Sequence, residues 1–302
     1  MEKRFCLSWQ VVSGESGFVL REFLKIKHIS KSALTDIKFD GGTILVNGEE
    51  ATVRRHLAEG DEVVIYFPLE APSEGLIAEI FPLEILYEDD FVLIVNKPPF
   101  MNTIPSREHP TGSLANGLAG YYKEKGIGST IHVVTRLDRD TSGLVLIAKH
   151  RHVHHLMSEQ QKSGGVKRLY EAFVHGDLEN GTKKIEAPIG RRPTSIIERE
   201  VREDGQYACT FYEVLGQYDG FSHVRLRLMT GRTHQIRVHM SYIGNPLLGD
   251  DLYGGKRDMI NRQALHCQSV TFYHPFLEKE LSFSIELPDD MKRIKELDRT
   301  KK

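Results

Sequence analysis

The chain reads Arg136-Leu137-Asp138-Arg139-Asp140-Thr141-Ser142-Gly143 and continues directly with Leu144-Val145-Leu146-Ile147-Ala148-Lys149. A dense polar cluster before an unbroken apolar run predicts a turn that leads into a buried strand. Asp138 lies between two arginines, whose positive charge favours an ionised carboxylate that can act as a nucleophile or a base. Taken alone, the octapeptide is more typical of an ion-paired surface turn, and the rest of the chain reverses that interpretation.

Length and composition indicate a globular protein with one sizeable domain and a smaller one. Of the 302 residues, 40% are hydrophobic and 27% are charged. No stretch is long and apolar enough to cross a bilayer, and Met1–Phe5 lacks an apolar signal core, so we expect a cytoplasmic protein with no membrane partner. Cys6, Cys209 and Cys267 lie far apart, which argues against a disulfide framework and a thiolate zinc site.

Basic residues are clustered locally although the formal net charge is only −2. Residues 224–249 contain four arginines and no Asp or Glu, and residues 149–170 contain five Lys or Arg against one Glu. Such segments on a weakly acidic chain indicate a one-sided positive field and an anionic partner. Arginines scattered over separate solvated faces are the alternative.

The first seventy residues predict a small module of two helices and a few strands. Residues 17–39 hold two helical patterns, the second of which Ser30 or Ser32 is expected to cap. Strands are predicted at 43–46, where Asn47-Gly48 indicates a hairpin, and at 61–67. Basic residues dominate the helices and give them a face suited to phosphate contact; they include Arg21, Lys25 and Lys31.

The order of Ile29-Ser30-Lys31, Val46-Asn47-Gly48 and Gly60-Asp61 within residues 20–67 resembles an S4-type RNA-binding domain. A generic small α+β domain with solvated lysines is the alternative. Residues 68–82 contain three prolines and a glycine and are typical of a linker.

The rest of the chain alternates predicted strands and helices. Strands are expected at 84–87 and 91–95, helices at 113–125 and 150–161, a strand at 167–174, two strands across 208–230, and a turn and helix at 230–240. His150, His152, His154 and His155 crowd the start of one helix, but no acid or cysteine lies near them. We therefore expect a polar, RNA-facing or solvated face there and no metal site.

Two further side chains attract attention in this half. Tyr170 is either a core aromatic or a platform on which a flipped nucleobase stacks. Arg237, between Ile236 and Val238, is expected to be partly buried, which requires an anionic partner, and Asp138 is a candidate.

Three stretches in order, residues 136–143, Lys167-Arg168-Leu169-Tyr170-Glu171-Ala172 and residues 230–239, together resemble the RluA-type pseudouridine synthases, and the match covers residues 84–287. The resemblance implies an α+β fold: a small helix-helix-strand domain followed by a larger mixed, largely antiparallel sheet with flanking helices. It divides the chain into an S4-like domain at 14–67, a linker at 68–80, a catalytic domain at 81–290 and a charged tail at 291–302.

The resemblance also implies residue roles. Asp138 matches the catalytic aspartate, Tyr170 the base-stacking tyrosine, Arg237 the partner of the aspartate, and Arg136 the arginine that displaces the target base. Further RNA contacts are expected from Arg139, Arg232 and Lys97, and in the first module from Arg21, Lys25 and Lys31. The sequence departs from the family at Thr135, usually histidine, and at Phe100, usually the glycine of Lys-Pro-x-Gly.

The implied reaction converts uridine in RNA to pseudouridine. Nothing is oxidised or hydrolysed, so no metal or organic cofactor is expected, and the sequence contains no P-loop, HExxH or Rossmann fingerprint. Large-subunit ribosomal RNA is favoured over transfer RNA, and a monomer without an obligate protein partner is expected. The alternatives are a non-catalytic RNA-binding or ribosome-assembly protein and a hydrolase that uses Asp138 with a second carboxylate. Whether Asp138 attacks C1′ or C6 or removes a sugar proton stays open.

Overall fold

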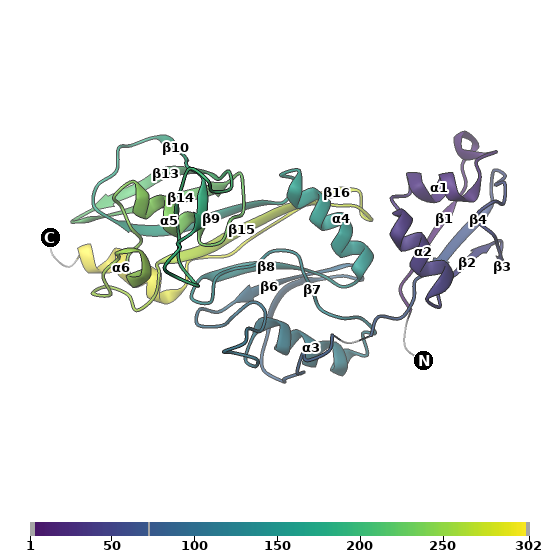
Figure 1. The fold of residues 1–302 in the computed structure, drawn as a ribbon, viewed down its shortest axis with the longest axis horizontal. Coiled ribbons are helices and arrows are strands. Elements are labelled where there is room, and N and C mark those ends of the chain that lie inside the picture. The colour runs from purple at the N-terminus through teal and green to yellow at the C-terminus, as the bar shows by residue number, and fades with distance from the viewer. Residues whose placement is uncertain (1–3, 72, 300–302) are drawn as a thin grey trace.

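The computed structural model describes residues 4–71 and 73–299, which form two lobes (Figure 1). The smaller, N-terminal lobe contains a four-stranded sheet in the order β1-β4-β2-β3 and two helices. Its elements are β1 Cys6–Gln10, a short 3-10 turn Ser13–Glu15, α1 Leu20–Ile26, α2 Lys31–Phe39, β2 Thr43–Val46, β3 Glu49–Glu50 and β4 Glu62–Tyr66. The sheet thus begins before residue 14, where the module was expected to start, because β1 pairs antiparallel with β4.

Local sequence signals explain the folding of this lobe. The hydroxyl of Ser30 accepts a hydrogen bond from the Ala33 amide at 3.1 Å and caps α2, as predicted. Asn47 and Gly48 both have positive φ, the conformation of a tight hairpin turn. The core is built from side chains of both helices and the sheet, and it includes Leu20, Phe23, Leu24, Ile37, Val46 and Val63.

The larger lobe is built around a ten-stranded sheet with the main order β10-β13-β14-β9-β15-β8-β6-β5, while β16 pairs with β15 and β7 with β8. The strands are β5 Glu84–Glu88, β6 Val92–Lys97, β7 His132–Val133, β8 Ser142–Ala148, β9 Lys167–His175, β10 Thr182–Glu186, β13 Cys209–Tyr218, β14 Phe221–Leu228, β15 Leu265–His274 and β16 Lys279–Ser284. The pair β15–β8 is parallel, and the other described pairs of this sheet are antiparallel. The predicted mixed, largely antiparallel α+β fold is confirmed.

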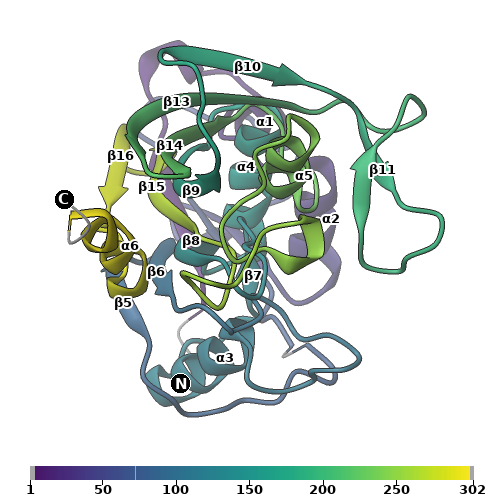
Figure 2. The same ribbon diagram turned by 90° about the vertical axis from the view of Figure 1, so that its left-hand side faces the viewer.

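The remaining elements surround this sheet or project from it. They are α3 Leu114–Lys125, α4 Arg151–Lys162, the two-stranded hairpin β11 Ile189–Arg191 and β12 Arg199–Val201, α5 Gln235–Tyr242, a 3-10 turn Asp251–Tyr253 labelled η2, and α6 Asp289–Arg299. Figure 2 shows the β11–β12 hairpin extending away from the sheet on the side of α5. Among the described residues, no helix has the length and apolar character needed to cross a membrane.

Helix α6 replaces most of the charged tail that was predicted at 291–302. Met291 and Ile294 are fully buried and pack in a cluster with Phe173 and Leu248. Asp290 at its start accepts hydrogen bonds from buried Arg262 at 2.7 and 3.0 Å. The density of charged residues predicted a tail. The structure differs because Met291 and Ile294, three residues apart, lie on one face of α6 and pack it against the large lobe.

Two of the four histidines at the start of α4, His150 and His152, lie between the two lobes, whereas His155 is exposed as expected. The ring of His150 stacks on Phe5 at 3.9 Å, and the ring of buried His152 stacks on Phe67 at 5.2 Å. Burial lowers the pKa of both histidines to about 4. The expectation of a solvated face is wrong for His150 and His152, because the sequence of α4 does not indicate that aromatic residues of the first lobe cover them.

The apolar run 144–148 forms β8, which is buried along its whole length between β6 and β15. Gly143, the second residue of this strand, has φ +119°, and a Cβ atom there would lie 2.3 Å from the Cys267 carbonyl oxygen of β15. Only glycine permits both this backbone conformation and this close approach. The polar loop 136–141 therefore leaves the sheet at a fixed point in its centre.

We expect Gly143→Ala to destabilise the protein by about 3 kcal/mol or more, because it combines an unfavourable φ with a backbone clash. The matched control is Gly220→Ala, which has a similar positive φ but no atom within 4 Å of the added Cβ. Its free energy of unfolding should fall by only about 1 kcal/mol. Urea unfolding followed by circular dichroism measures both, and equal losses would contradict the close-approach argument.

Candidate active site

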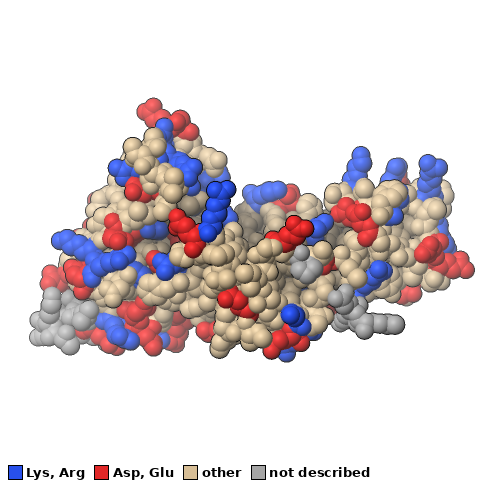
Figure 3. Space-filling view, turned by 60° about the horizontal axis from the view of Figure 1, so that its bottom comes forward, with Lys and Arg blue, Asp and Glu red and all other residues tan. Residues whose placement is uncertain are grey.

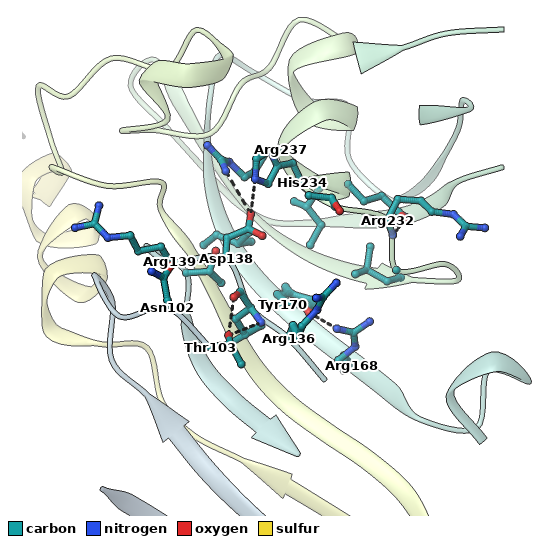
Figure 4. A pocket seen from close by; sticks show the side chains of 18 of the residues that line it. Asn102, Thr103, Arg136, Asp138, Arg139, Arg168, Tyr170, Arg232, His234 and Arg237 are labelled. Carbon is teal, nitrogen blue, oxygen red and sulfur yellow. Dashed lines mark hydrogen bonds and ion pairs between the residues drawn. The ribbon is translucent and has the colours of Figure 1, made fainter. Parts of the chain in front are cut away.

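A cavity of about 640 Å³ opens where the polar loop 136–141 leaves β8. Its walls come from the segment after β6, this polar loop, strand β9, and the turn at the start of α5 (Figure 4). Segments distant in sequence meet here because β8, β15 and β9 are neighbours in the sheet. Arg136, Asp138, Arg139, Tyr170, Arg232 and Arg237 of the predicted site all line this cavity.

The backbone around Asp138 is clamped from both sides. The hydroxyl of buried Thr103 donates to the Leu137 carbonyl at 2.7 Å and accepts from the Leu137 amide at 3.1 Å. On the other side, the ammonium of Lys97 donates to the Arg139 carbonyl at 3.1 Å. The side chain of Asp138 is 28% exposed and faces the cavity from this fixed backbone.

Lys97 was expected to contact RNA, and the structure contradicts this. Its side chain is fully buried, and its Nζ also donates to the carbonyls of Pro98 and Met101 at 2.9 and 2.7 Å. Burial lowers the pKa of Lys97 to about 7, against the attraction of Asp138 and Asp140. The three carbonyl acceptors match the three N–H groups of an ammonium, so Lys97 holds the loop and makes no contact with a ligand.

Arg237 of α5 is buried and lies between two carboxylates. Its Nη1 approaches Asp138 Oδ2, the predicted partner, at 3.3 Å. A stronger pair, absent from the prediction, joins its Nε and Nη2 to the two oxygens of Asp250, both at 2.7 Å. Burial opposes the charged form, but the hydrogen bonds to Asp250 and the charge of Asp138 raise the pKa of Arg237. The guanidinium is therefore permanently charged.

Asp250 was missed as a site residue although its sequence carried a signal. It follows the apolar residues Leu247 and Leu248 and a glycine, and its side chain is fully buried. An acid in such a context requires a cationic partner. The sequence could not indicate that this partner was Arg237, because the contact depends on how the 246–254 segment returns to α5.

Tyr170 lies on β9 with its ring against the cavity and is almost fully buried. Its hydroxyl accepts a hydrogen bond from Arg168 Nη1 at 3.1 Å. Burial raises the pKa of Tyr170, so the phenol keeps its proton at neutral pH. Arg168 also lines the cavity and was missed; the signal was its i, i+2 spacing to Tyr170, which places both side chains on one face of the strand.

The other predicted arginines form an exposed rim around this inner group. Arg136 and Arg139 are exposed on the polar loop, and Arg139 lies 3.7 Å from Asp140. Arg232 is also exposed and donates through Nε to the Tyr207 carbonyl at 2.9 Å. Figure 4 shows Arg139 and Arg232 on opposite sides of the cavity. Such a rim suits contact with a phosphate backbone.

Arg21, Lys25 and Lys31 do not reach this cavity. They are exposed on α1 and α2 of the N-terminal lobe, at the far end of the molecule from α5 (Figure 1). Figure 3 shows Lys and Arg side chains projecting from one edge of that lobe. The structure therefore has two basic regions, one around the cavity and one on the small lobe.

The two departures from the family pattern lie outside the inner group. Thr135 is fully buried, and its hydroxyl accepts from the Leu146 amide at 2.9 Å. Phe100 has φ +64°, the conformation for which glycine is usual, and its side chain is 53% exposed. Thr135 thus supports the polar loop from inside, and Phe100 presents an aromatic ring to solvent.

Several known proteins are similar to this chain in fold or in sequence. The human RNA pseudouridylate synthase domain containing 1 has a similar fold, with a TM-score of 0.57, 23% identity and coverage of 76% of this chain and 97% of that chain. The uncharacterized RNA pseudouridine synthase YjbO of Bacillus subtilis (strain 168) is 52% identical over 91% of this chain and 97% of its own. The ribosomal large subunit pseudouridine synthase D of Vibrio parahaemolyticus is 38% identical over 87% of this chain and 84% of its own.

A family model described as RNA pseudouridylate synthase matches residues 91–242, which include Asp138, Tyr170 and Arg237. The match therefore spans the residues that line the cavity, apart from Leu265 of β15. Together with relatives of this similarity and coverage, it shows that the chain is an enzyme that belongs to the RNA pseudouridine synthase family.

Proposed function

We propose that this enzyme isomerises specific uridines of structured large-subunit ribosomal RNA, and that Asp138 is the catalytic carboxylate. The observation that carries the proposal is the meeting of Asp138, Tyr170 and Arg237 in one cavity, from three separate segments of the chain. A flipped nucleotide needs an aromatic ring on which its base can stack and an ionised carboxylate that can react with it, and a fixed guanidinium keeps that carboxylate ionised.

Each inner residue has a separate task in this proposal. The target base leaves its helix, with Arg136 taking its place, and enters the cavity against the ring of Tyr170. Asp138 then acts on the nucleotide while Arg237 stabilises its charge. The N1–C1′ bond breaks, the C5–C1′ bond forms, the C5 proton is released to solvent and N1 gains a proton. No redox partner and no added water molecule enter this balance.

The substrate assignment rests on two supports. The relative from Vibrio parahaemolyticus, which aligns over most of both chains, is named as a ribosomal large subunit enzyme. The N-terminal lobe resembles an S4-type RNA-binding domain in its motif order, and it carries exposed Arg21, Lys25 and Lys31 on its two helices. In our proposal these side chains contact phosphates of the RNA whose target uridine occupies the cavity.

Asp138→Asn should reduce turnover by about 10³-fold or more, because it removes the reacting carboxylate. RNA affinity should stay within about threefold, since phosphate contacts supply most of it. Tritium release from 5-³H-uridine RNA measures turnover, and filter binding measures affinity.

The matched control for this prediction is Asp140→Asn, which removes a carboxylate from the same loop but outside the cavity lining. It should keep turnover within about fivefold of the wild type. Full activity of Asp138→Asn would refute the assignment. Free uracil as a product of the wild type would show a hydrolase.

Replacing Lys25 and Lys31 with alanine should weaken RNA binding and reduce the slope of log affinity against log salt by about 1 to 2, without abolishing turnover. The control replaces Lys183 and Lys292, whose charges are already compensated by Glu179 and Glu286. Affinity is measured by filter binding between low and high salt. Identical slopes for both double variants would exclude an RNA-binding role for the N-terminal lobe.

A further inference from the structure

His234 holds an unusual backbone conformation at the edge of the cavity. It directly precedes α5 and has φ 56° and ψ 19°, the left-handed region, which is uncommon outside glycine although His, Asn and Asp adopt it more readily than other residues. This conformation places its ring beside the inner group, with Nε2 3.9 Å from Asp138 Oδ2 (Figure 4). Backbone strain of this kind persists where the surrounding structure requires a particular side-chain position.

The protonation of the His234 ring follows from its hydrogen bonds. The Tyr253 hydroxyl accepts from the Arg199 amide at 2.9 Å and lies 2.8 Å from His234 Nδ1. The amide can only donate, and among the described residues Nδ1 is the acceptor within reach of the hydroxyl proton, so the hydroxyl donates to Nδ1. A neutral imidazole in this arrangement carries its own proton on Nε2.

The charged groups around His234 leave it in this neutral form. Burial lowers its pKa, and Arg237 and Arg199 act in the same direction, whereas Asp138 and Asp250 oppose them. The Nε2–H group has no hydrogen bond among the described residues, because 3.9 Å is too long for a bond to Asp138. A donor fixed in tautomer and direction therefore faces the cavity without an acceptor in the protein.

We propose that His234 Nε2–H donates to a carbonyl oxygen of the target uracil, and that Tyr253 fixes the His234 tautomer for this purpose. This inference rests on the proposed function. Whether Asp138 acts at C1′ or at C6, electron density moves onto the uracil ring and its carbonyl oxygens before the C5–C1′ bond forms. A donor directed at that oxygen stabilises the developing charge more than the neutral ground state, so it acts on kcat and not on KM.

Two substitutions separate this role from a merely structural one. Asn tolerates the left-handed backbone and its amide can reach Tyr253, but it cannot place a donor at the position of Nε2. Gln has the reach to place a donor there. We expect His234→Asn to lower kcat by about 10- to 100-fold with KM for RNA within about threefold, and His234→Gln to retain at least about a fifth of the wild-type kcat.

Tyr253→Phe provides the second measurement, and it keeps the ring face that lies 4.9 Å from the Arg237 guanidinium. It should lower kcat by about 3- to 10-fold in the wild-type background and cause no further loss in the His234→Asn background. This non-additivity follows if Tyr253 acts only through His234. Losses that multiply in the double variant would overturn the role of Tyr253, whether or not His234→Gln folds.

The assay is tritium release from 5-³H-uridine-labelled large-subunit ribosomal RNA, with the wild type and Asp138→Asn measured alongside. Release by the wild type and its loss in Asp138→Asn test the proposed function independently of His234. Where that function holds, equal kcat values for His234→Asn and His234→Gln overturn the proposed donor. A change confined to KM overturns it as well.

Discussion

The buried pair between Arg237 and Asp250 is the interaction on which the site depends. Both side chains are almost completely removed from solvent, and both guanidinium–carboxylate contacts are 2.7 Å. Loss of either partner would leave an uncompensated buried charge, which typically costs about 3–5 kcal/mol. The pair also fixes α5 against the 246–254 segment, so that the remaining nitrogen of Arg237 points at Asp138. The buried carboxylate of Asp250 thus fixes the guanidinium that contacts the accessible carboxylate of Asp138.

A second constraint acts on the backbone that carries Asp138. Lys97 at the end of β6 and Thr103 just beyond it bind the polar loop through main-chain groups, and the buried side chain of Leu137 anchors the loop in the core. The loop is therefore free to present charged side chains to the cavity and to its rim. Preorganisation of this kind lets a site stabilise developing charge without rearranging when the reaction occurs.

The packing of the two lobes determines where the second basic region stands. The rings of Phe5 and Phe67 from the small lobe stack on His150 and His152 of α4, and linker residue Glu70 bonds to His132 of the large lobe. Neutral imidazoles suit this role because they stack on phenyl rings without carrying a buried charge. The helices α1 and α2 are consequently held at a set distance from the cavity.

By itself, the sequence located most helices and strands, because apolar periodicity is a local property of the chain. The resemblance of its motifs to a known family implied the fold class and the grouping of Asp138, Tyr170 and Arg237 in one site. Even the Asp138–Arg237 contact followed from the need of a buried arginine for an anion. Only the tertiary structure revealed Asp250, Arg168 and the place of His234 beside Asp138, and it removed Lys97 from the ligand-contacting set. Those facts depend on which strands are neighbours and on how the polar groups of distant segments pair. The Arg237–Asp250 pair spans only 13 residues, yet it leaves no periodic signal in the chain, because it forms only when the 246–254 segment folds back on α5.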